Sequence, residues 1–197
     1  MDIREFDRQA LEGTDRVVAQ VTEDRLGAPT PCDGWDLRAL LVHMTGNNNG
    51  FADAAEGRPA DPEVWAGAGI GDDLVGEYQK SAERVGAAFA AGGVLERKLH
   101  VYGYGTYSAP EAIGMHFIDY LVHGWDVARA IGVDHRLDPQ LCLAVLEIGE
   151  TWPQDSPRIW GPGAPFGKRI PISADAPADH RMLGFLGRPP AWPHMVT

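Results

Sequence analysis

Residues 108–132, SAPEAIGMHFIDYLVHGWDVARAIG, are the stretch of sequence that decides the fold. Ser108 and Glu111 have the S-x-x-E spacing of a capping box, and Pro110 falls in the first turn, so we expect a helix to begin here. Gly132 is a natural residue just beyond the C-terminal end of that helix. A helix of about 23 residues is ~34 Å long, enough to cross a domain. Because most of its residues are apolar, we expect it to lie inside the protein.

Four ionisable residues interrupt this apolar stretch at helical spacing. His116, Asp119, His123 and Asp126 stand at i, i+3, i+7 and i+10, and therefore share one face. Such a stripe also forms when the side chains face solvent or satisfy one another by hydrogen bonds. In an internal helix, however, an unpaired carboxylate is costly and needs a partner.

A third candidate donor for Asp119 and His123 is His43, which lies in the apolar run Leu40–Met44. Asp36 is the expected N-cap of a second helix, which places His43 in its second turn. If the two helices pack together, two imidazoles and one carboxylate converge, and a divalent cation would offset the cost of burying them. This ligand set, which has no thiolate, suits Zn²⁺ with an open coordination position; Ni²⁺, Mn²⁺ or Fe²⁺ remain alternatives. An ion held in this way could activate a bound water or thiol, or polarise a carbonyl group.

The remaining polar residues near this set have candidate roles of their own. His116 and Asp126 are candidate catalytic acid/base groups or supports for the metal ligands, although Asp126 could equally pair with Arg129 one turn away. Asn47 shares a helix face with His43 and is a candidate for binding a cofactor or substrate. A simple polar run at a helix end is the alternative for Asn47.

The rest of the chain predicts a mainly α-helical protein, with an up-and-down four-helix bundle and a small C-terminal strand and helix. Bundle cores are places where facing side chains build metal sites. We expect residues 1–150 to form the bundle and residues 151–197 to form an appendage packed on it. Further elements are expected at about 2–22, 36–57, 72–91 and 138–150, with a short strand at 168–173 and a last helix ending near 186. Residues 94–107 are ambiguous, and residues 58–71 read as a loop.

Composition narrows the classes of function. The 197 residues are 44% hydrophobic and 23% charged, as in a globular protein, and the formal net charge is −11. This charge and the lack of a basic cluster argue against nucleic acid or an anionic membrane as a partner. We find no apolar run long enough to span a bilayer and no signal-peptide pattern, so we expect a cytoplasmic protein. The partner we expect is a small-molecule substrate, and the sequence leaves a homodimer open.

The two cysteines, Cys32 and Cys142, are too few for a disulfide framework. Cys142 lies in a helix-like apolar run and is expected to be a buried, inert thiol. Cys32 lies in a loop between proline and glycine residues, where it is the better candidate for exposure. Nothing close to it in the sequence indicates that it is activated.

Three motifs taken together resemble a known family. They are Thr30–Leu37, TPCDGWDL, followed by His43; Asp119–Gly132, which contains HGWDVARAIG; and Leu183–Arg188, LGFLGR. In combination they are similar to the mycothiol-dependent maleylpyruvate isomerases and the DinB-like metal-binding proteins, and the match covers nearly the whole chain.

This resemblance implies a DinB/YfiT-like bundle whose metal ligands are His43, Asp119 and His123. In the isomerase proper the middle ligand is a glutamate, whereas here it is Asp119, which has a shorter side chain. The chain also lacks an obvious extended C-terminal domain of the kind that helps the isomerase bind mycothiol. Mycothiol as a co-substrate is therefore an expectation from the wider family.

The leading hypothesis from the sequence is a metal-dependent enzyme that activates a low-molecular-weight thiol, such as mycothiol, or water. The reaction would be transfer, isomerisation or hydrolysis on a small electrophilic substrate. Two alternatives stay open: a protein that binds a metal or small ligand without turnover, and a metal-free helical domain with a hydrogen-bonded His/Asp cluster.

Overall fold

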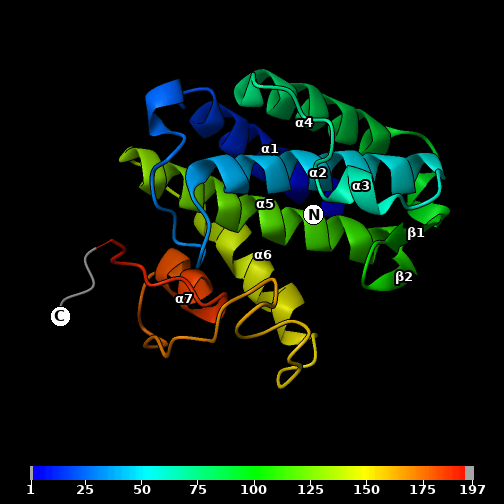
Figure 1. The fold of residues 1–197 in the computed structure, drawn as a ribbon. Helices are drawn as coiled ribbons and strands as arrows, with labels where there is room; N and C mark the ends of the chain where they lie inside the picture. The colour runs from blue at the N-terminus through cyan, green and yellow to red at the C-terminus, as the bar shows by residue number, and fades with distance from the viewer. Residues whose placement is uncertain (1, 194–197) are drawn as a thin grey trace. The chain divides into compact units, whose positions relative to one another are not determined.

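The chain divides into two compact units, Met1–Val133 and Asp134–Thr197. The computed structural model describes residues 2–193. The first unit is a bundle of the four long helices α1, α2, α4 and α5, in which α1 lies along α5 and α2 lies along α4 (Figure 1). Its elements are α1 (Ile3–Val18), η1 (Glu23–Arg25), α2 (Leu37–Glu56), α3 (Pro62–Trp65), α4 (Leu74–Ala90), η2 (Val94–Glu96), β1 (Lys98–Val101), β2 (Gly105–Ser108) and α5 (Ala109–Ile131).

The side-chain contacts between the long helices give their directions. Contacts of α2 with α5 run in opposite residue order, Asn47 with Asp119 and Asn48 with His116, so these helices are antiparallel. The contacts of α1 with α5, and those of α2 with α4, run in the same residue order, so each of these two pairs is parallel. The expected four-helix bundle is confirmed, but its helices run up, down, down and up instead of alternating up and down, since α4 is parallel to α2. The long connection over residues 57–73 lets α4 return parallel to α2.

Local signals fix the ends of the two helices that matter most for the site. Asp36 caps α2 by accepting a hydrogen bond from the backbone N–H of Ala39 at 2.8 Å. The backbone N–H of Ser108 donates to the Glu111 carboxylate at 2.9 Å in the capping box of α5. Gly132 ends α5 with φ of 77°, a left-handed conformation that glycine adopts without strain. These caps set the register of the side chains that α2 and α5 present to each other.

The connection between α2 and α4 contains a short helix that sequence analysis did not predict. This helix, α3, begins at Pro62 after the N-cap Asp61 and brings Trp65 against α2. A Cβ atom added at Gly46 would lie 2.6 Å from the Trp65 carbonyl oxygen, and one at Gly50 would lie 2.3 Å from its ring. The two glycines of α2 therefore admit a close approach that any larger residue would block.

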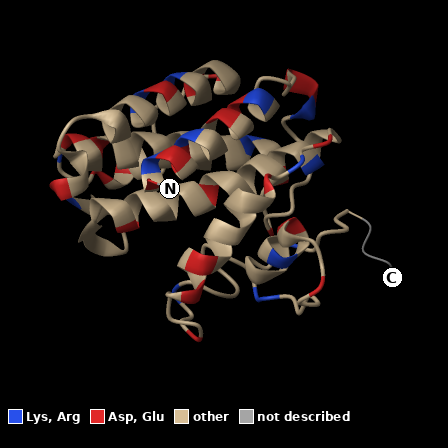
Figure 2. Ribbon diagram, turned by 180° about the vertical axis from the view of Figure 1, so that it is seen from behind, with Lys and Arg blue, Asp and Glu red and all other residues tan. Residues whose placement is uncertain are grey.

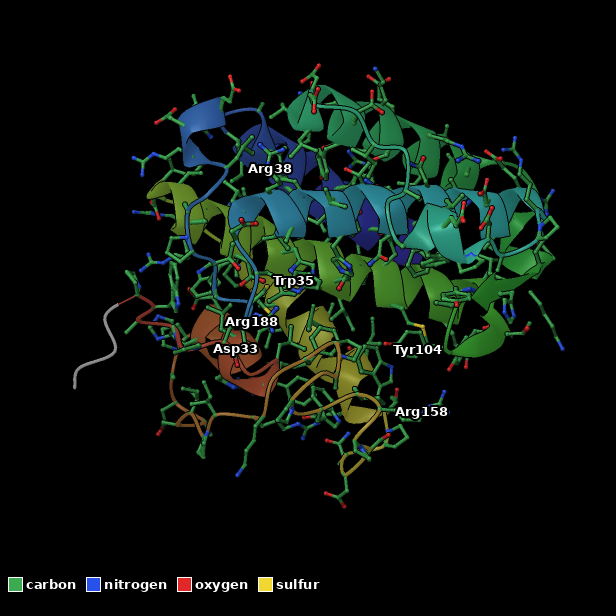
Figure 3. The ribbon with its side chains drawn as sticks, in the orientation of Figure 1. Asp33, Trp35, Arg38, Tyr104, Arg158 and Arg188 are labelled. Atoms are coloured by element: carbon green, nitrogen blue, oxygen red, sulfur yellow. The ribbon has the colours of Figure 1, made fainter. Side chains whose placement is uncertain are left out.

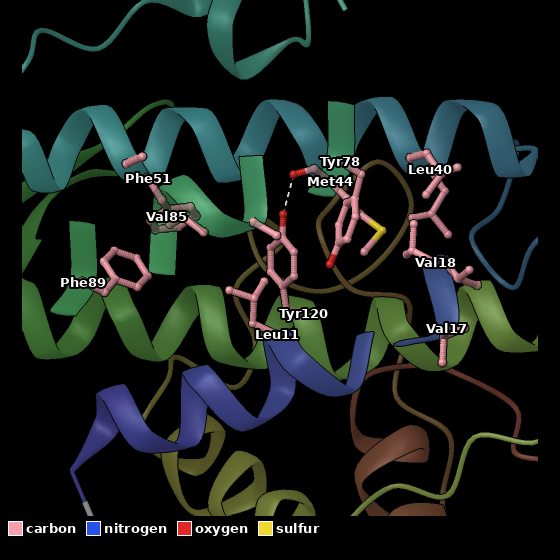
Figure 4. Close-up of a cluster of buried hydrophobic side chains, with 14 of the residues drawn as sticks. Leu11, Val17, Val18, Leu40, Met44, Phe51, Tyr78, Val85, Phe89 and Tyr120 are labelled. Atoms are coloured by element: carbon pink, nitrogen blue, oxygen red, sulfur yellow. Dashed lines mark hydrogen bonds between the residues drawn. The ribbon is translucent and has the colours of Figure 1, made fainter. Parts of the chain in front are cut away.

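The core of the bundle is apolar but holds one buried tyrosine that links two helices. Tyr120 on α5 is fully buried, and its hydroxyl donates to the backbone carbonyl of Met44 on α2 (Figure 4). The buried hydroxyl thereby has a hydrogen-bond partner inside the core, as buried polar groups require. Side chains from all four long helices complete this core, among them Leu11, Val17, Val18, Leu40, Phe51, Val85 and Phe89.

Acidic and basic side chains are interspersed along the outer helices of the bundle (Figure 2). Arg84 on α4, for example, pairs with Asp53 and Glu56 on α2. The Arg84 and Asp53 side chains are 30% and 12% exposed, so this pair is partly buried. Among residues 2–193, none of the helices combines the length and the apolar character that crossing a bilayer would need.

The second unit holds α6 (Pro139–Glu150) and α7 (Ala178–Phe185). The division of the chain falls at 133/134 instead of the expected 150, because α6 packs against α7 through Gly149 and Phe185. The prediction of a strand at 168–173 is wrong, because this segment has no strand partner among the described residues. Its backbone makes a hydrogen bond from the Ile170 N–H to the Gly184 carbonyl. Two aromatic residues of this unit contact one cation: the guanidinium of Arg169 lies over the rings of Trp160 and Phe185 in cation–π contacts.

Candidate metal centre

The antiparallel pairing of α2 and α5 brings together the three residues predicted as metal ligands. His43 comes from the second turn of α2, and Asp119 and His123 lie one turn apart on the facing side of α5. Nε2 of His43 is 3.8 Å from Oδ2 of Asp119, and Nε2 of His123 is 3.3 Å from Oδ1 of the same carboxylate. One donor atom from each residue lies within 4.8 Å of the other two. The predicted convergence of these side chains is therefore present.

The spacing of these atoms fits a divalent ion. A tetrahedral Zn²⁺ with ligands at ~2.0–2.1 Å places neighbouring donor atoms ~3.3 Å apart. The observed separations of 3.3 and 3.8 Å are close to that value, although they run to different oxygens of Asp119, and one donor atom from each residue lies within 4.8 Å of the other two. Two imidazole nitrogens and a carboxylate oxygen are also the donor types that leave a position open on zinc or a similar ion. The residues present thus fit the metal that the sequence pattern implies.

Burial is graded across the three ligands. The side chain of His123 is 4% exposed, that of Asp119 is 15% exposed and that of His43 is 29% exposed. The group is therefore sealed on the His123 side and reaches solvent beside His43.

The electrostatics of the group are those of a buried ion pair. Burial by itself would raise the pKa of Asp119, but the imidazoles of His123 and His43 outweigh it and hold that pKa well below its usual range. Burial would likewise lower the pKa of His123, but the Asp119 carboxylate outweighs it and holds that pKa well above its usual range. Without a metal, the cluster therefore carries a proton on His123 that a cation must displace.

Asn47, predicted to bind a cofactor or substrate, lies directly on the ligand atoms. Its Nδ2 donates to Oδ2 of Asp119 at 3.1 Å and is also 3.1 Å from Nε2 of His43. The amide thus occupies the gap between two of the three candidate ligands. Asn47 therefore belongs to this cluster and not to a plain polar run at a helix end, and an ion bound to Nε2 of His43 would displace the Asn47 amide from that atom.

Asp126 supports His123 from the other side of its ring. Its Oδ2 is 2.9 Å from Nδ1 of His123, and the carboxylate is fully buried. An ionised carboxylate only accepts hydrogen bonds, so Nδ1 carries the proton and Nε2 is left to face Asp119. Metal-binding histidines are commonly oriented by a carboxylate in this manner. The geometry favours this orienting role for Asp126 over direct acid/base catalysis.

His116, the other predicted catalytic residue, lies in a separate buried cluster. Its Nδ1 is 2.6 Å from Oδ1 of Asp7 on α1, and its Nε2 is 3.0 Å from Oδ1 of Asn48 on α2. Its ring stacks on Tyr120 with the centroids 4.0 Å apart. Both ring nitrogens already have partners in the core, so the structure favours a structural role and offers no basis for the expected acid/base role.

Two residues near the centre were missed as functional candidates. Sγ of Cys32 is 3.2 Å from Oδ2 of Asp126 and 3.8 Å from Nδ1 of His123. The indole of Trp35 lies 4.7 Å from the His43 imidazole, centroid to centroid, and remains 36% exposed (Figure 3). Their shared signal was the TPCDGW motif, which we analysed as a loop followed by a helix cap because the sequence does not show what a loop touches.

Cys32, His123 and Asp126 also form a second group with metal-ligand spacing. It uses Nδ1 of His123, whereas the first group uses Nε2. In the second group Nδ1 is already bound to the Asp126 carboxylate, and each member has a partner within the group. The first group, which reaches solvent, is the better place for an exchangeable ligand.

Comparisons with known proteins agree with this architecture. Residues 8–128 match the family described as the mycothiol maleylpyruvate isomerase N-terminal domain. Two uncharacterised proteins of Mycobacterium tuberculosis, from strains CDC 1551 / Oshkosh and ATCC 25618 / H37Rv, are each 31% identical to this chain over 181 residues. Each alignment covers 92% of this chain and 94% of the relative.

Solved structures with the same fold include the mycothiol-dependent maleylpyruvate isomerase and a mutant of it. Their TM-scores are 0.58 and 0.60, at 17% and 15% sequence identity. The superpositions cover 75% of this chain and 66% of the isomerase, so this chain spans about two thirds of the length of those structures. The fold is therefore DinB-like, as expected, and the chain belongs to the mycothiol maleylpyruvate isomerase N-terminal domain family.

Proposed function

We propose that this protein is a metal-dependent enzyme that uses His43, Asp119 and His123 to activate a low-molecular-weight thiol for attack on a small electrophilic substrate. The observation that carries the proposal is the convergence of these three donors at a site open to solvent on one side. A divalent ion bound there, most simply Zn²⁺, supplies the positive charge that favours the ionised form of a thiol or water.

The protein residues perform the remaining tasks. Asp119 places a negative charge between two imidazoles and so favours a cation at that point. Asp126 holds His123 with Nε2 directed toward Asp119. Trp35 forms an apolar wall beside His43 on the exposed side, where it can exclude water from part of the approach.

A thiol is favoured as the activated group because the solved relatives are mycothiol-dependent enzymes by name. Transfer of the thiol and isomerisation through its reversible addition both begin with the same attack. Hydrolysis would use the same ligands with water in place of the thiol. The competing function is a binding protein in which the same cluster holds a metal or small ligand without turnover.

The first experiment measures metal content and thiol-dependent turnover on the same preparations. Purified protein is analysed for transition metals, loaded with Zn²⁺, and assayed with mycothiol against maleylpyruvate and against a general thiol-reactive electrophile. We expect one metal per chain and consumption of an electrophile only when metal and thiol are both present.

His43→Ala should abolish both metal retention and turnover. The matched control is His100→Ala, which removes an exposed histidine on β1 and should leave both properties unchanged. Metal binding without thiol-dependent turnover would support the binding protein. Absence of stoichiometric metal, together with no Zn²⁺-induced rise in the melting temperature, would reject the metal-dependent enzyme and the metal-binding form of the competing function.

A further inference from the structure

The loop that precedes α2 is held in a fixed conformation by its own hydrogen bonds. The Thr30 hydroxyl donates to the Trp35 carbonyl at 2.8 Å and accepts from the Cys32 backbone N–H at 3.1 Å. The Trp35 N–H donates to the Cys32 carbonyl at 3.0 Å, and Pro29 pairs with Asp36 as an antiparallel bridge. The backbone of Cys32 is thereby tied on both sides, so its side chain is presented to α5 from a rigid turn.

The thiol of Cys32 meets the support of the candidate metal centre. It donates to Oδ2 of Asp126 at 3.2 Å, which is the same oxygen that accepts from Nδ1 of His123 at 2.9 Å. Asp126 is fully buried, where a carboxylate depends on donors of fixed direction. Two donors on one oxygen, one from the loop and one from α5, restrict the rotation of this carboxylate.

The orientation of Asp126 determines what His123 can do. When Asp126 accepts from Nδ1, Nε2 is deprotonated on metal binding and lies 3.3 Å from Asp119 Oδ1. A carboxylate free to turn would hold the ring in this orientation for less of the time. The position of the Cys32 thiol is therefore coupled to the coordinating nitrogen through one intermediate residue.

We propose that Cys32 is a positioning residue of the metal centre: its thiol holds Asp126 in the orientation that directs Nε2 of His123 toward Asp119. This inference rests on the proposed metal site and adds to it a residue outside the ligand set. It also explains why the TPCDGW loop lies against the centre, since the same turn places Cys32 behind His123 and Trp35 beside His43.

Cys32 is assigned to this role and not to coordination because of the nitrogen it approaches. Sγ lies 3.8 Å from Nδ1 of His123, which is the nitrogen bound to Asp126 and not the one facing Asp119. If Cys32 and Nδ1 of His123 bound one ion while Nε2 bound another beside Asp119, the His123 ring would have to lose the protons on both nitrogens. The positioning role keeps one nitrogen for each partner.

The test compares variants that keep or lose a donor at position 32. Cys32→Ser keeps a hydroxyl donor, whereas Cys32→Ala and Cys32→Val remove it; Asp33→Asn, an exposed neighbour in the same loop, is the control. Zn²⁺ affinity is measured by competition with a chromophoric chelator, and Co²⁺-loaded protein is examined by absorption spectroscopy. Loss of a partner in the shell around metal ligands typically weakens metal binding ~10–100-fold, and we expect a loss of about 10-fold for the two non-donor variants. We expect serine to remain close to the wild type and the control to be unchanged.

The outcomes separate this inference from the proposed function. Wild-type protein that binds no Zn²⁺ would reject the metal centre itself, and the inference with it. Wild-type binding with unchanged affinity in Cys32→Ala would reject only the positioning role. Serine as weak as alanine would also reject it, and a thiolate-to-cobalt charge-transfer band that disappears in Cys32→Ser would show Cys32 to be a ligand. If both non-donor variants fail to fold while serine folds, Cys32 has a folding role and the positioning role is rejected.

Discussion

Helix α5 carries two histidine–carboxylate clusters, around His116 and around His123, and they differ in how completely they are closed. The first joins His116, Asp7 and Asn48, and the Asn48 amide continues to the Ser81 hydroxyl at 2.9 Å, so the chain of hydrogen bonds touches all four long helices. It is buried throughout. The second has three donor atoms that face one another and reaches solvent beside His43.

The difference shows what distinguishes a structural polar cluster from a candidate functional one. In the closed cluster, each His116 nitrogen has a protein partner and no approach from solvent remains. In the open cluster, one face of His123 is fixed by Asp126 while the other presents Nε2 to a carboxylate and a second imidazole. A pair of histidine and aspartate residues is therefore not enough to indicate a metal site. The donor atoms must also converge, and the cluster must reach solvent.

The largest expected effect is the loss of metal binding in His43→Ala. It removes one of three ligands, so Zn²⁺ affinity should fall by more than the ~10–100-fold that outer partners contribute. Chelator competition measures this loss. In the wild type, Zn²⁺ at 100 times its Kd should stabilise the fold by about 2.7 kcal/mol, and this gain should vanish in the variant. A variant that retained wild-type affinity would show that His43 is not a ligand.

For His116→Ala we expect a loss of folding stability with no change in Zn²⁺ affinity. Removing one partner of a buried hydrogen bond typically costs ~1–3 kcal/mol, because the Asp7 side chain is left without its partner. Urea unfolding of metal-free protein measures this loss. The Zn²⁺ affinity of the folded variant should equal that of the wild type. Weakened metal binding with unchanged stability would place His116 in the functional cluster after all.

A smaller effect is expected when the support of His123 is altered. Asp126→Asn keeps the shape but replaces the carboxylate with an amide that can present a donor to Nδ1. Zn²⁺ affinity should fall ~10–100-fold, as for other partners of metal ligands. The control is Asp134→Asn, an exposed aspartate whose replacement should change nothing. Equal affinity in Asp126→Asn and the wild type would show that the carboxylate does not orient the ring.

The smallest expected effect, up to about tenfold for each pH unit, is the pH dependence of metal binding at the open cluster. Asp119 holds the pKa of His123 above its usual value, so near neutral pH the metal must displace a proton from that ring. Zn²⁺ affinity should therefore rise with pH, by up to about tenfold per unit for one displaced proton, and level off above the raised pKa. Titrations at several pH values measure the slope, and a flat profile from pH 6 to 8 would contradict it.

Much of the bundle could be predicted from local sequence, because its signals are local. The capping box at Ser108 and the glycine at 132 marked both ends of α5, and Asp36 marked the start of α2. Helix α3 was missed because its four residues are too few to show a period. The strand expected at 168–173 was wrong because this segment has no partner strand among the described residues, which local sequence does not show.

The candidate ligands were predictable for a similar reason. Asp119 and His123 share a face by helical spacing alone, and the apolar sequence around His43 indicated a buried helix. What spacing could not separate was His116 from His123, since both lie on polar positions of one helix and differ only in what surrounds them.

The sequence by itself determined the long helices, their caps and the histidine and aspartate residues available to a metal, because these depend on interactions within a few residues along the chain. Only the tertiary structure decided that His116 is closed by Asp7 and Asn48, that His43 completes the set around His123, and that Cys32 lies behind it. These are contacts between residues 68 to 109 positions apart. Their geometry follows from how the helices and the loop pack, which local spacing does not encode.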